Sequence, residues 1–252
     1  MIGDQFKQAE QRSETFIEPV YVIARIDGRR FSKFSKHFKK PYDRTLARLM
    51  RATSMQLAKN YSPDLVYFQS DEISLYWKHL DIFSRRTQKI ASTLAASATA
   101  AFMYELSVIR PELLHRQPSF DARVHNVADI NETYDYFLWR AIDARKNSIH
   151  SWSKQYMSQK ALNCVPSRKM LELLTPEQQA GYHNAPAYFK LGTFLKREAV
   201  YKPIKNALDI PEKFRPPEGS LVLHHQYNAY SVDMQAMSRY KAILNILACT
   251  LR

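Results

Sequence analysis

The chain has 252 residues, and its 37 Lys and Arg against 24 Asp and Glu give a formal net charge of +13. A chain of this length can bury a core without disulfides or a structural metal, and no apolar stretch approaches the roughly 20 residues of a membrane-spanning helix. The two cysteines, Cys164 and Cys249, have no metal-ligand spacing and suit a reducing compartment. We therefore expect a cytoplasmic protein with no membrane segment. The positive charge favours polyanionic partners such as nucleic acid over a surface that is basic only for solubility.

The first predicted elements are a buried strand, a basic loop and an amphipathic helix. Residues 21–27 form an apolar run rich in β-branched side chains, which predicts a strand that ends at Gly28. Lysines and arginines crowd the loop of residues 29–40. Asp43 is the predicted N-cap of a helix, because apolar residues recur with helical spacing over residues 46–57.

Two strands at residues 65–68 and 73–77 follow, joined by a tight turn at residues 69–72. A strand–helix–strand crossover makes the first two strands of the chain run the same way, so their carboxyl ends lie at the same edge of a sheet. If the third strand returns between them, Asp27 and the neighbouring acids Asp71 and Glu72 converge at that edge.

A long helix is predicted for residues 85–106, which are rich in Ala and lack Gly and Pro. It begins with Arg85, Arg86 and Lys89. Basic side chains in a first helical turn oppose the helix dipole, at a cost on the order of a few tenths of a kcal/mol each. A bound anion would remove this conflict, and a solvated face is an equally weighted alternative.

The remaining elements complete an α+β pattern. In chain order they are a strand at residues 120–127, a helix from residue 131, an irregular proline-rich stretch at residues 202–219, an edge strand around residues 222–224 and a short terminal helix. This order predicts a sheet with its helices on one face.

Two carboxylates brought to one sheet edge repel each other and raise each other's pKa unless a cation lies between them. A pair of Mg²⁺ ions about 3.5–4 Å apart would resolve this conflict, and could activate a hydroxyl and steady a leaving phosphate. The predicted ligands are the side chains of Asp27 and Asp71 and the carbonyl oxygen of Gly28. The histidines are scattered and no CxxC pair occurs, so the pattern does not suit zinc. The alternative for each acid is a polar strand end or a solvated hairpin turn.

Five segments, in this order along the chain, closely resemble motifs of the histidine-tRNA guanylyltransferase superfamily. They are Ala24–Phe31, Lys40–Asp43, Gln69–Ser74, Phe120–Val124 and Asp135–Asp143. The resemblance covers roughly residues 4–195. It implies an enzyme that adds nucleotides to the 5′ end of tRNA in the 3′-to-5′ direction, with two Mg²⁺ ions, with ATP and GTP as substrates, and as a homotetramer.

The same resemblance implies an architecture. Residues 1–130 would form a palm-like (ferredoxin-like) catalytic region, an antiparallel sheet flanked by helices. Residues 131–200 would form a helical, fingers-like region that contacts tRNA and nucleotide. Residues 201–252 would be a C-terminal extension of unknown role.

The resemblance also implies site residues. By resemblance, Asp27, Asp71 and Glu72 are the catalytic acids, and Asp27, Gly28 and Asp71 hold the metal ions. The residues implied in nucleotide binding are Arg25, Arg29, Arg30, Phe31, Ser32, Lys40, Asp43, Ser70, Arg86 and Lys89, with the backbone amides of residues 29–31 holding a triphosphate. Those implied in RNA contact or 5′ activation are Arg140, Arg145, Asn147 and Lys169.

One segment departs from the pattern of the enzymes that add the extra guanylate to histidine tRNA. Those enzymes carry His-x-Asn-Asn-Leu-Tyr-Asn, whereas residues 145–151 read Arg-Lys-Asn-Ser-Ile-His-Ser. Arg145 replaces the histidine and His150 the tyrosine. This form resembles the tRNA guanylyltransferase-like branch, whose members restore missing 5′ nucleotides on truncated tRNAs, using the opposite strand as template.

Metal-dependent, template-dependent repair of tRNA 5′ ends is therefore the predicted function. Guanylate addition to histidine tRNA is the first alternative. A nucleotide cyclase is a further alternative, since palm-like hairpins with acidic turns also serve that chemistry. A non-catalytic RNA-binding module with a ferredoxin-like sheet is the last.

Overall fold

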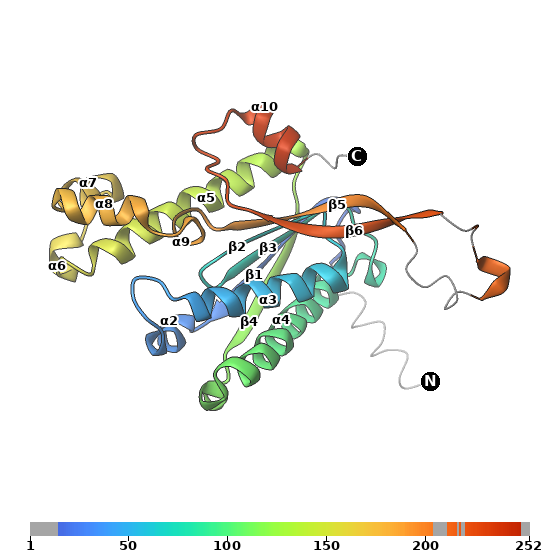
Figure 1. The fold of residues 1–252 in the computed structure, drawn as a ribbon, viewed down its shortest axis with the longest axis horizontal. Coiled ribbons are helices and arrows are strands. Elements are labelled where there is room, and N and C mark those ends of the chain that lie inside the picture. Colours follow the sequence, from blue (N-terminus) through green and yellow to red (C-terminus); the bar gives the residue numbers. More distant parts are fainter. Residues whose placement is uncertain (1–14, 204–210, 216, 218–219, 248–252) are drawn as a thin grey trace.

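A six-stranded antiparallel sheet lies at the centre of the chain (Figure 1). The computed structural model describes residues 15–203, 211–215, 217 and 220–247. The strands are β1 (Val20–Arg29), β2 (Leu65–Gln69), β3 (Glu72–His79), β4 (Ser119–Asn126), β5 (Thr193–Pro203) and β6 (Leu221–Tyr230), in the spatial order β4-β1-β3-β2-β5-β6. Because β3 lies between β1 and β2 and pairs antiparallel with both, β1 and β2 run the same way, as the crossover predicts.

Two long helices, α3 and α4, cover one face of the sheet (Figure 1). α3 (Arg44–Tyr61) has Asp43 as its N-cap, as predicted, and α4 spans Thr87–Ile109. Alternate side chains of β1 point to this face, since successive residues of a strand face opposite sides. They are Val22, Ala24 and Ile26, which are buried in one cluster with Leu49, Leu94 and Phe102 of the helices.

The opposite face is covered as well, by α5 (Ile130–Ser153) and by the terminal elements α10 (Arg239–Ala242) and η6 (Ile243–Leu247). The strand residues Ile23, Leu65, Tyr67, Tyr76 and Phe194 pack there with Tyr134, Phe137 and Ile246. The prediction of helices on one face is therefore wrong. An uninterrupted apolar run such as residues 21–27 is typical of a strand that is buried on both sides.

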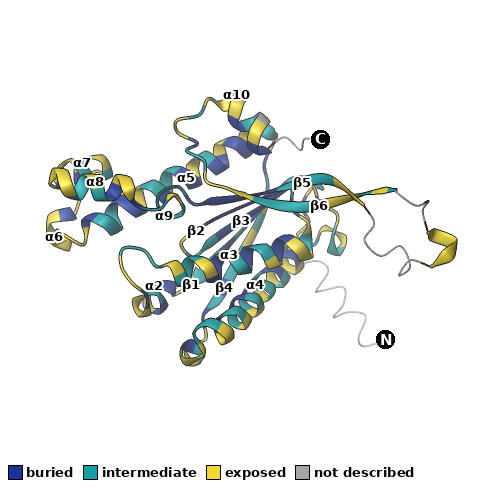
Figure 2. Ribbon diagram, in the orientation of Figure 1, coloured by how far each residue is buried: buried dark blue, intermediate teal, exposed yellow. Residues whose placement is uncertain are grey.

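A helical lobe packs around the C-terminal half of α5. It consists of α6 (Gln159–Leu162), α7 (Ser167–Glu172), α8 (Pro176–Asn184) and α9 (Ala187–Leu191). Its small core includes Ile149, Leu162, Met170, Tyr182 and Phe189, and many of its outward-facing residues are exposed (Figure 2). The shorter elements of the chain are α2 (Phe31–Phe34), η1 (Ser35–His37), η2 (Phe83–Arg85), η3 (Pro111–Arg116) and η5 (Glu212–Phe214). No described helix is both long and apolar enough to cross a membrane.

Several boundaries differ from the prediction. β1 continues through Gly28 to Arg29, because its pairing with β4 extends that far. α4 begins at Thr87, so Arg86 is its N-cap and only Lys89 of the three basic residues lies in the first helical turn.

The sheet also contains a strand that the sequence did not predict. β5 covers residues expected in the helical region and at the start of the C-terminal extension, and it joins the sheet by pairing with β2 and β6. β6 is the edge strand expected around residues 222–224. The irregular stretch expected at residues 202–219 lies partly outside the described residues.

Candidate active site

The end of β1 and the β2–β3 turn are tied together at one edge of the sheet. The backbone N–H of Gly28 donates to the carbonyl oxygen of Asp71 over 3.1 Å. Asp27 is the register partner of Glu72, the first residue of β3. Gly28 leaves no room for a side chain, since a Cβ atom there would lie 3.0 Å from the Cβ of Asp71 and 2.4 Å from the ring of Phe31. The structure thus brings Asp27, Gly28 and Asp71 together, as the topology predicts.

The electrostatics of Asp71 favour a cation at this edge. Burial raises the pKa of Asp71, and the negative charge of Asp27 raises it further, while the Ser70 hydroxyl and the Lys40 ammonium oppose the shift. A cation between the two carboxylates would relieve both the burial cost and the repulsion.

The donor set suits Mg²⁺. Within the described part of the chain, no group of three or more His, Cys, Asp or Glu side chains is arranged to hold a metal ion. Two carboxylates and the backbone oxygen of Gly28 are hard oxygen ligands, and Mg²⁺ is commonly held by one or two protein carboxylates together with water and substrate phosphates. The residues present therefore fit the expected ion.

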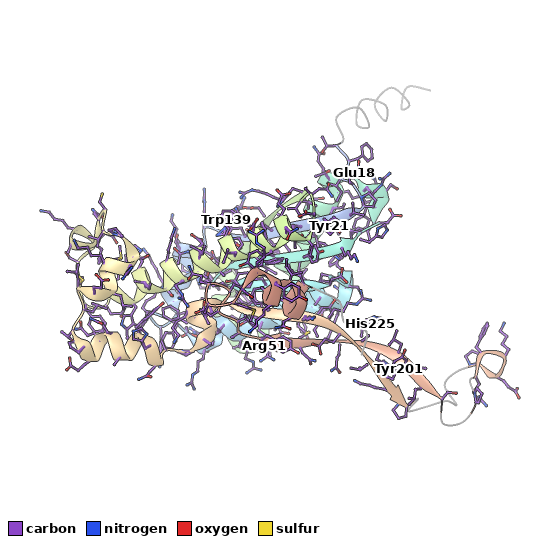
Figure 3. All side chains as sticks on the ribbon, turned by 90° about the horizontal axis from the view of Figure 1, so that it is seen from above. Glu18, Tyr21, Arg51, Trp139, Tyr201 and His225 are labelled. Carbon is purple, nitrogen blue, oxygen red and sulfur yellow. The ribbon has the colours of Figure 1, made fainter. Side chains whose placement is uncertain are left out.

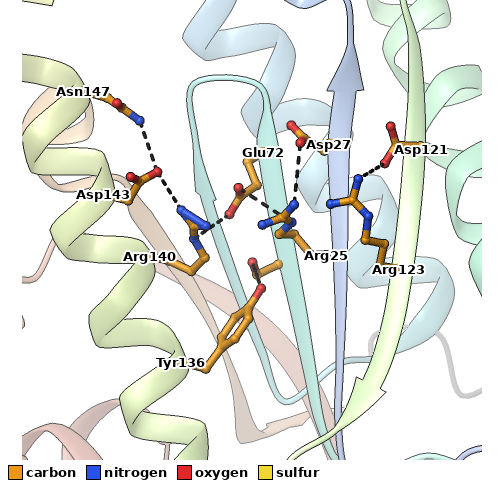
Figure 4. A network of polar contacts seen from close by, with 10 residues as sticks. Arg25, Asp27, Glu72, Asp121, Arg123, Tyr136, Arg140, Asp143 and Asn147 are labelled. Carbon is orange, nitrogen blue, oxygen red and sulfur yellow. Dashed lines mark hydrogen bonds and ion pairs between the residues drawn. The ribbon is translucent and has the colours of Figure 1, made fainter. Parts of the chain in front are cut away.

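A chain of alternating charges runs along the α5-facing side of the site (Figure 4). Arg25 lies 3.9 Å from the carboxylate of Asp27 and 4.0 Å from that of Glu72. Glu72 in turn lies 3.1 Å from Nε of Arg140, which reaches in from α5. Burial raises the pKa of Glu72, whereas the Arg140 and Arg25 charges lower it.

Arg140 is buried, with 5% of its surface exposed. Its guanidinium lies 2.6 Å from Asp143, whose carboxylate accepts a hydrogen bond from Asn147 at 3.2 Å. The outer side of the guanidinium stacks on the ring of Trp139, 3.9 Å from the ring centroid. Arg140 was expected to contact RNA or act in 5′ activation, but in this conformation its charge is occupied by Glu72 and Asp143. Its position indicates that it orients Glu72.

A cavity of about 400 Å³ opens beside the aspartates, between the β2–β3 turn, the start of α3, α5 and α9. The predicted site residues that line it are Asp27, Lys40, Asp43, Ser70, Asp71, Glu72, Arg140 and Asn147. Clefts of a few hundred Å³ with a few polar groups are typical small-molecule sites. The end of β1, the start of α3 and the β2–β3 turn thus contribute to one pocket.

Two lining residues from the basic loop also have structural contacts. Oδ1 of Asp43 accepts hydrogen bonds from the backbone N–H groups of Thr45 and Leu46 at 2.7 and 3.0 Å and so caps α3. Oδ2 accepts from the backbone N–H of Lys39 at 3.0 Å, which ties the preceding loop to the start of the helix. The ammonium of Lys40 donates to the Ser35 hydroxyl over 3.2 Å.

The segment expected to hold a triphosphate begins directly after the aspartate edge. Arg30 has φ 59°, a left-handed conformation that turns the chain from β1 into α2. Phe31 is buried against Phe34, Phe102 and Phe120, which anchors this turn in the core, whereas Arg29, Arg30 and Ser32 are exposed. The side chain of Phe31 therefore has a packing role.

Other predicted residues are not brought to the cavity. Arg86 pairs with Phe16, ahead of the first residue of β1, and Lys89 follows it in the first turn of α4. They are separated from Asp27 by most of the length of that strand, roughly 23 Å at the usual rise per residue. Arg145 forms an ion pair with Asp233 on the loop after β6, and Lys169 is exposed on α7.

The sequence analysis missed several residues that shape the site. Tyr136 of α5 shares a buried hydrogen bond of 2.8 Å with the Ser74 hydroxyl on β3, and burial raises its pKa to about 12. Tyr67 donates to the carbonyl of Leu191 over 3.0 Å, which fastens α9 to β2. No local pattern signals these two hydrogen bonds, because each joins residues that are far apart in the chain.

Comparison of the chain with a family model and with relatives of known name shows its family. A family model described as "Thg1: tRNAHis guanylyltransferase" matches residues 3–128. The tRNA(His) guanylyltransferase of Debaryomyces hansenii is 33% identical over 222 residues, which cover 80% of this chain and 83% of that protein. The chain belongs to the tRNA(His) guanylyltransferase family. It is therefore a nucleotidyltransferase, and the resemblance found in its motifs is confirmed.

Further members of the family are similar along most of their length. The tRNA(His) guanylyltransferase of Saccharomyces cerevisiae is 27% identical over 219 residues, 80% of this chain and 92% of that protein. A bacterial tRNA(His) guanylyltransferase-like protein solved in complex with ATP has a TM-score of 0.72 at 33% identity, covering 79% of this chain and 87% of that chain. The same kind of protein in complex with GTP has a TM-score of 0.64 at 31% identity, covering 79% and 86%.

Proposed function

We propose that this chain adds nucleotides to the 5′ end of a tRNA in a reaction that depends on divalent metal ions. The observation that carries the proposal is the convergence of Asp27 and Asp71 beside a cavity of about 400 Å³. The names of the relatives support tRNA as the acceptor, and the ATP and GTP complexes of the bacterial neighbours support nucleoside triphosphates as substrates.

The side chains of Asp27 and Asp71 and the carbonyl of Gly28 would hold Mg²⁺, which supplies charge stabilisation for the attacking and leaving oxygens. Arg25 and Arg140 orient Glu72 beside this pair from opposite sides. Lys40 lies close enough to Asp71 to lower its pKa, so its ammonium is placed to contact a phosphate bound there. The backbone amides of residues 29–31, which directly follow Asp27 and Gly28 in the chain, would hold a triphosphate.

The reaction joins the 3′-hydroxyl of an incoming nucleotide to the 5′-phosphorus of the tRNA. The tRNA end is first activated by ATP, or already bears a triphosphate. The hydroxyl oxygen forms the new P–O bond, the bond to the leaving group breaks, and AMP or pyrophosphate departs. The contribution of the protein to this step is alignment and charge stabilisation in the cavity.

The relatives' names favour guanylate addition to histidine tRNA as the specific activity, and they support it more directly than they support repair. Repair of truncated tRNAs is the second candidate, favoured by Arg145. This residue replaces the histidine of the guanylate-adding pattern and is ion-paired with Asp233 instead of lining the cavity. A homotetrameric assembly and a cytoplasmic location stay predictions.

One assay separates the two candidates. Full-length histidine tRNA and a tRNA of another identity that lacks its first nucleotide are each incubated with the enzyme, Mg²⁺, ATP and labelled GTP. Guanylate addition to the full-length histidine tRNA, without regard to a template base, supports the first candidate. Preferential, template-directed restoration of the truncated tRNA supports the second. If neither tRNA acquires label but cyclic nucleotide forms without RNA, the proposed function is wrong.

A further inference from the structure

Three arginines lie along one face of α3, outside the site described above. Arg44, Arg48 and Arg51 are spaced so that they point to the same side of the helix, and all three are exposed. None of them forms an ion pair with another residue that the structure describes.

The arginines line a groove of about 380 Å³ between α3 and the end of β6. Figure 3 shows Arg51 next to the β5–β6 hairpin, and Ala229, Tyr230 and Ser231 form the β6 side of the groove. Within the described part of the chain, the residues that line it include no Asp or Glu. The groove is therefore a concentrated positive surface, with Tyr230 and Ser231 on its opposite wall.

This arrangement costs stability in the isolated chain. The first turn of α3 has no acidic residue and carries Arg44, which opposes the helix dipole. Arg48 is close to both of the other arginines on the helix surface, and like charges at these spacings repel. An anion bound in the groove would offset the unfavourable interaction of Arg44 with the helix dipole and the repulsion among the three arginines.

The groove is continuous with the candidate active site. Ala47, Phe68 and Tyr188 line both the catalytic cavity and the arginine groove. Asp43, which lines the catalytic cavity, directly precedes Arg44 in the chain. A strand whose 5′ end lies in the cavity can therefore pass directly over α3.

We propose that the groove formed by Arg44, Arg48 and Arg51 binds the phosphate backbone of the RNA acceptor next to its 5′ end. The inference rests on the proposed function, because it takes tRNA as the acceptor. Guanidinium groups bind phosphate oxygens through paired hydrogen bonds, and such contacts hold a nucleic acid in register without reading its sequence. The surface would serve any tRNA, so it does not depend on the choice between guanylate addition and repair.

The test compares two double variants that remove the same charge. R48Q/R51Q neutralises the groove and leaves Arg44 and the Asp43 cap in place, and glutamine has nearly the helix propensity of arginine. K59Q/K78Q removes two exposed lysines, one in the last turn of α3 and one near the end of β3, away from the cavity. The dissociation constant for a tRNA transcript and for a hairpin of its acceptor stem is measured over a range of salt concentrations.

For R48Q/R51Q we expect roughly tenfold weaker binding of both RNAs at low salt, and a slope of log K against log salt that is smaller by about 1.4–1.8, since two phosphate contacts are lost. K59Q/K78Q should keep the wild-type slope and affinity. At saturating tRNA, kcat of R48Q/R51Q should stay near the wild-type value.

Other outcomes overturn the inference. If R48Q/R51Q is folded by circular dichroism and binds both RNAs as tightly as K59Q/K78Q does, the groove does not bind RNA. The proposed function is unaffected by this outcome if the wild-type chain still incorporates nucleotides. If the variant changes only its oligomeric state, the partner is a second copy of the chain. If the wild-type chain itself binds no tRNA, the proposed function fails together with this inference.

Discussion

Nε of Arg140 on α5 lies 3.1 Å from a carboxylate oxygen of Glu72 on β3, and this contact connects α5 to the catalytic edge, the edge of the sheet that carries Asp27 and Asp71. Only 6% of the Arg140 side chain is exposed, compared with 20% of the Glu72 side chain. Removing one partner of a buried ion pair leaves the other charge desolvated without compensation. The pair therefore links the stability of the fold to the geometry of the site.

Arg140→Gln should lower the free energy of unfolding by about 1–3 kcal/mol, since Glu72 is largely buried and Asp143 is partly exposed to water. Arg140→Lys should fall between wild type and Arg140→Gln, because an ammonium cannot span both carboxylates as a guanidinium does. Urea unfolding measures both. The matched control is Arg168→Gln on α7, whose side chain is 93% exposed and paired with Glu172. An equal effect of the Arg140 and Arg168 changes would argue against a structural role for the buried pair.

Asp71→Ala should reduce nucleotide incorporation at least about 10³-fold, because it removes one of the two carboxylates proposed to hold metal. Binding of tRNA should be nearly unchanged, since the contacts proposed for RNA lie elsewhere. Incorporation of labelled GTP and a filter-binding assay measure the two properties separately. Normal turnover by this variant would contradict the assignment of Asp27 and Asp71 as the carboxylates that hold metal.

Addition of MgCl2 should raise the Tm of the wild-type chain more than NaCl of equal ionic strength does, because an ion that binds only the folded state stabilises it. The effect should largely disappear in Asp71→Asn, where one carboxylate of the pair is neutral. Thermal unfolding followed by circular dichroism gives this readout without catalysis. Equal shifts for wild type and variant would show that Mg²⁺ acts at another place.

Gly28→Ala should lower the free energy of unfolding by about 1–3 kcal/mol and abolish incorporation, because the new methyl group overpacks the contact with Phe31 and Asp71. The double variant Gly28→Ala/Phe31→Leu relieves the closest clash, which is with the ring. It should therefore regain part of the stability relative to the sum of the two single changes, as a double-mutant cycle in urea would measure. Strict additivity would contradict the proposed contact.

Asp43→Ala should cost about 1 kcal/mol of stability at neutral pH, the usual effect of losing an N-cap. Burial tends to raise the pKa of Asp43, but the backbone N–H groups of Lys39, Leu46 and Thr45 together lower it below its ordinary value of 3.8. A lowered pKa in the folded state means that the contribution is fully present above that ordinary value and is lost as the pH falls through the folded-state pKa. The difference between wild type and Asp43→Ala should therefore shrink in acid. Asp43→Asn keeps a neutral cap, so its free energy of unfolding should depend less on pH. Identical profiles of stability against pH for all three proteins would contradict a stabilising role for the ionised Asp43 cap.

The catalytic edge was predictable because the signals for it are local. The apolar run at residues 21–27, the Asp43 cap and the short turn after residue 68 each define an element within a few residues, and the crossover rule then sets their directions. The pairing of β3 between β1 and β2 confirmed that Asp27 and Asp71 share an edge.

The surroundings of that edge depended on contacts between distant parts of the chain. β5 becomes a strand through pairing with β2 and β6, and the burial of Arg140 follows from α5 packing on the second face of the sheet. The family resemblance implies a role for Arg86 and Lys89 in nucleotide binding, yet the length of β1 separates them from the aspartates within one chain. The amino-acid sequence by itself determined the acids, their strands and the family, since these depend on short-range patterns. Which charged groups meet those acids was decided only in the folded chain, because long-range packing chooses the neighbours of a side chain.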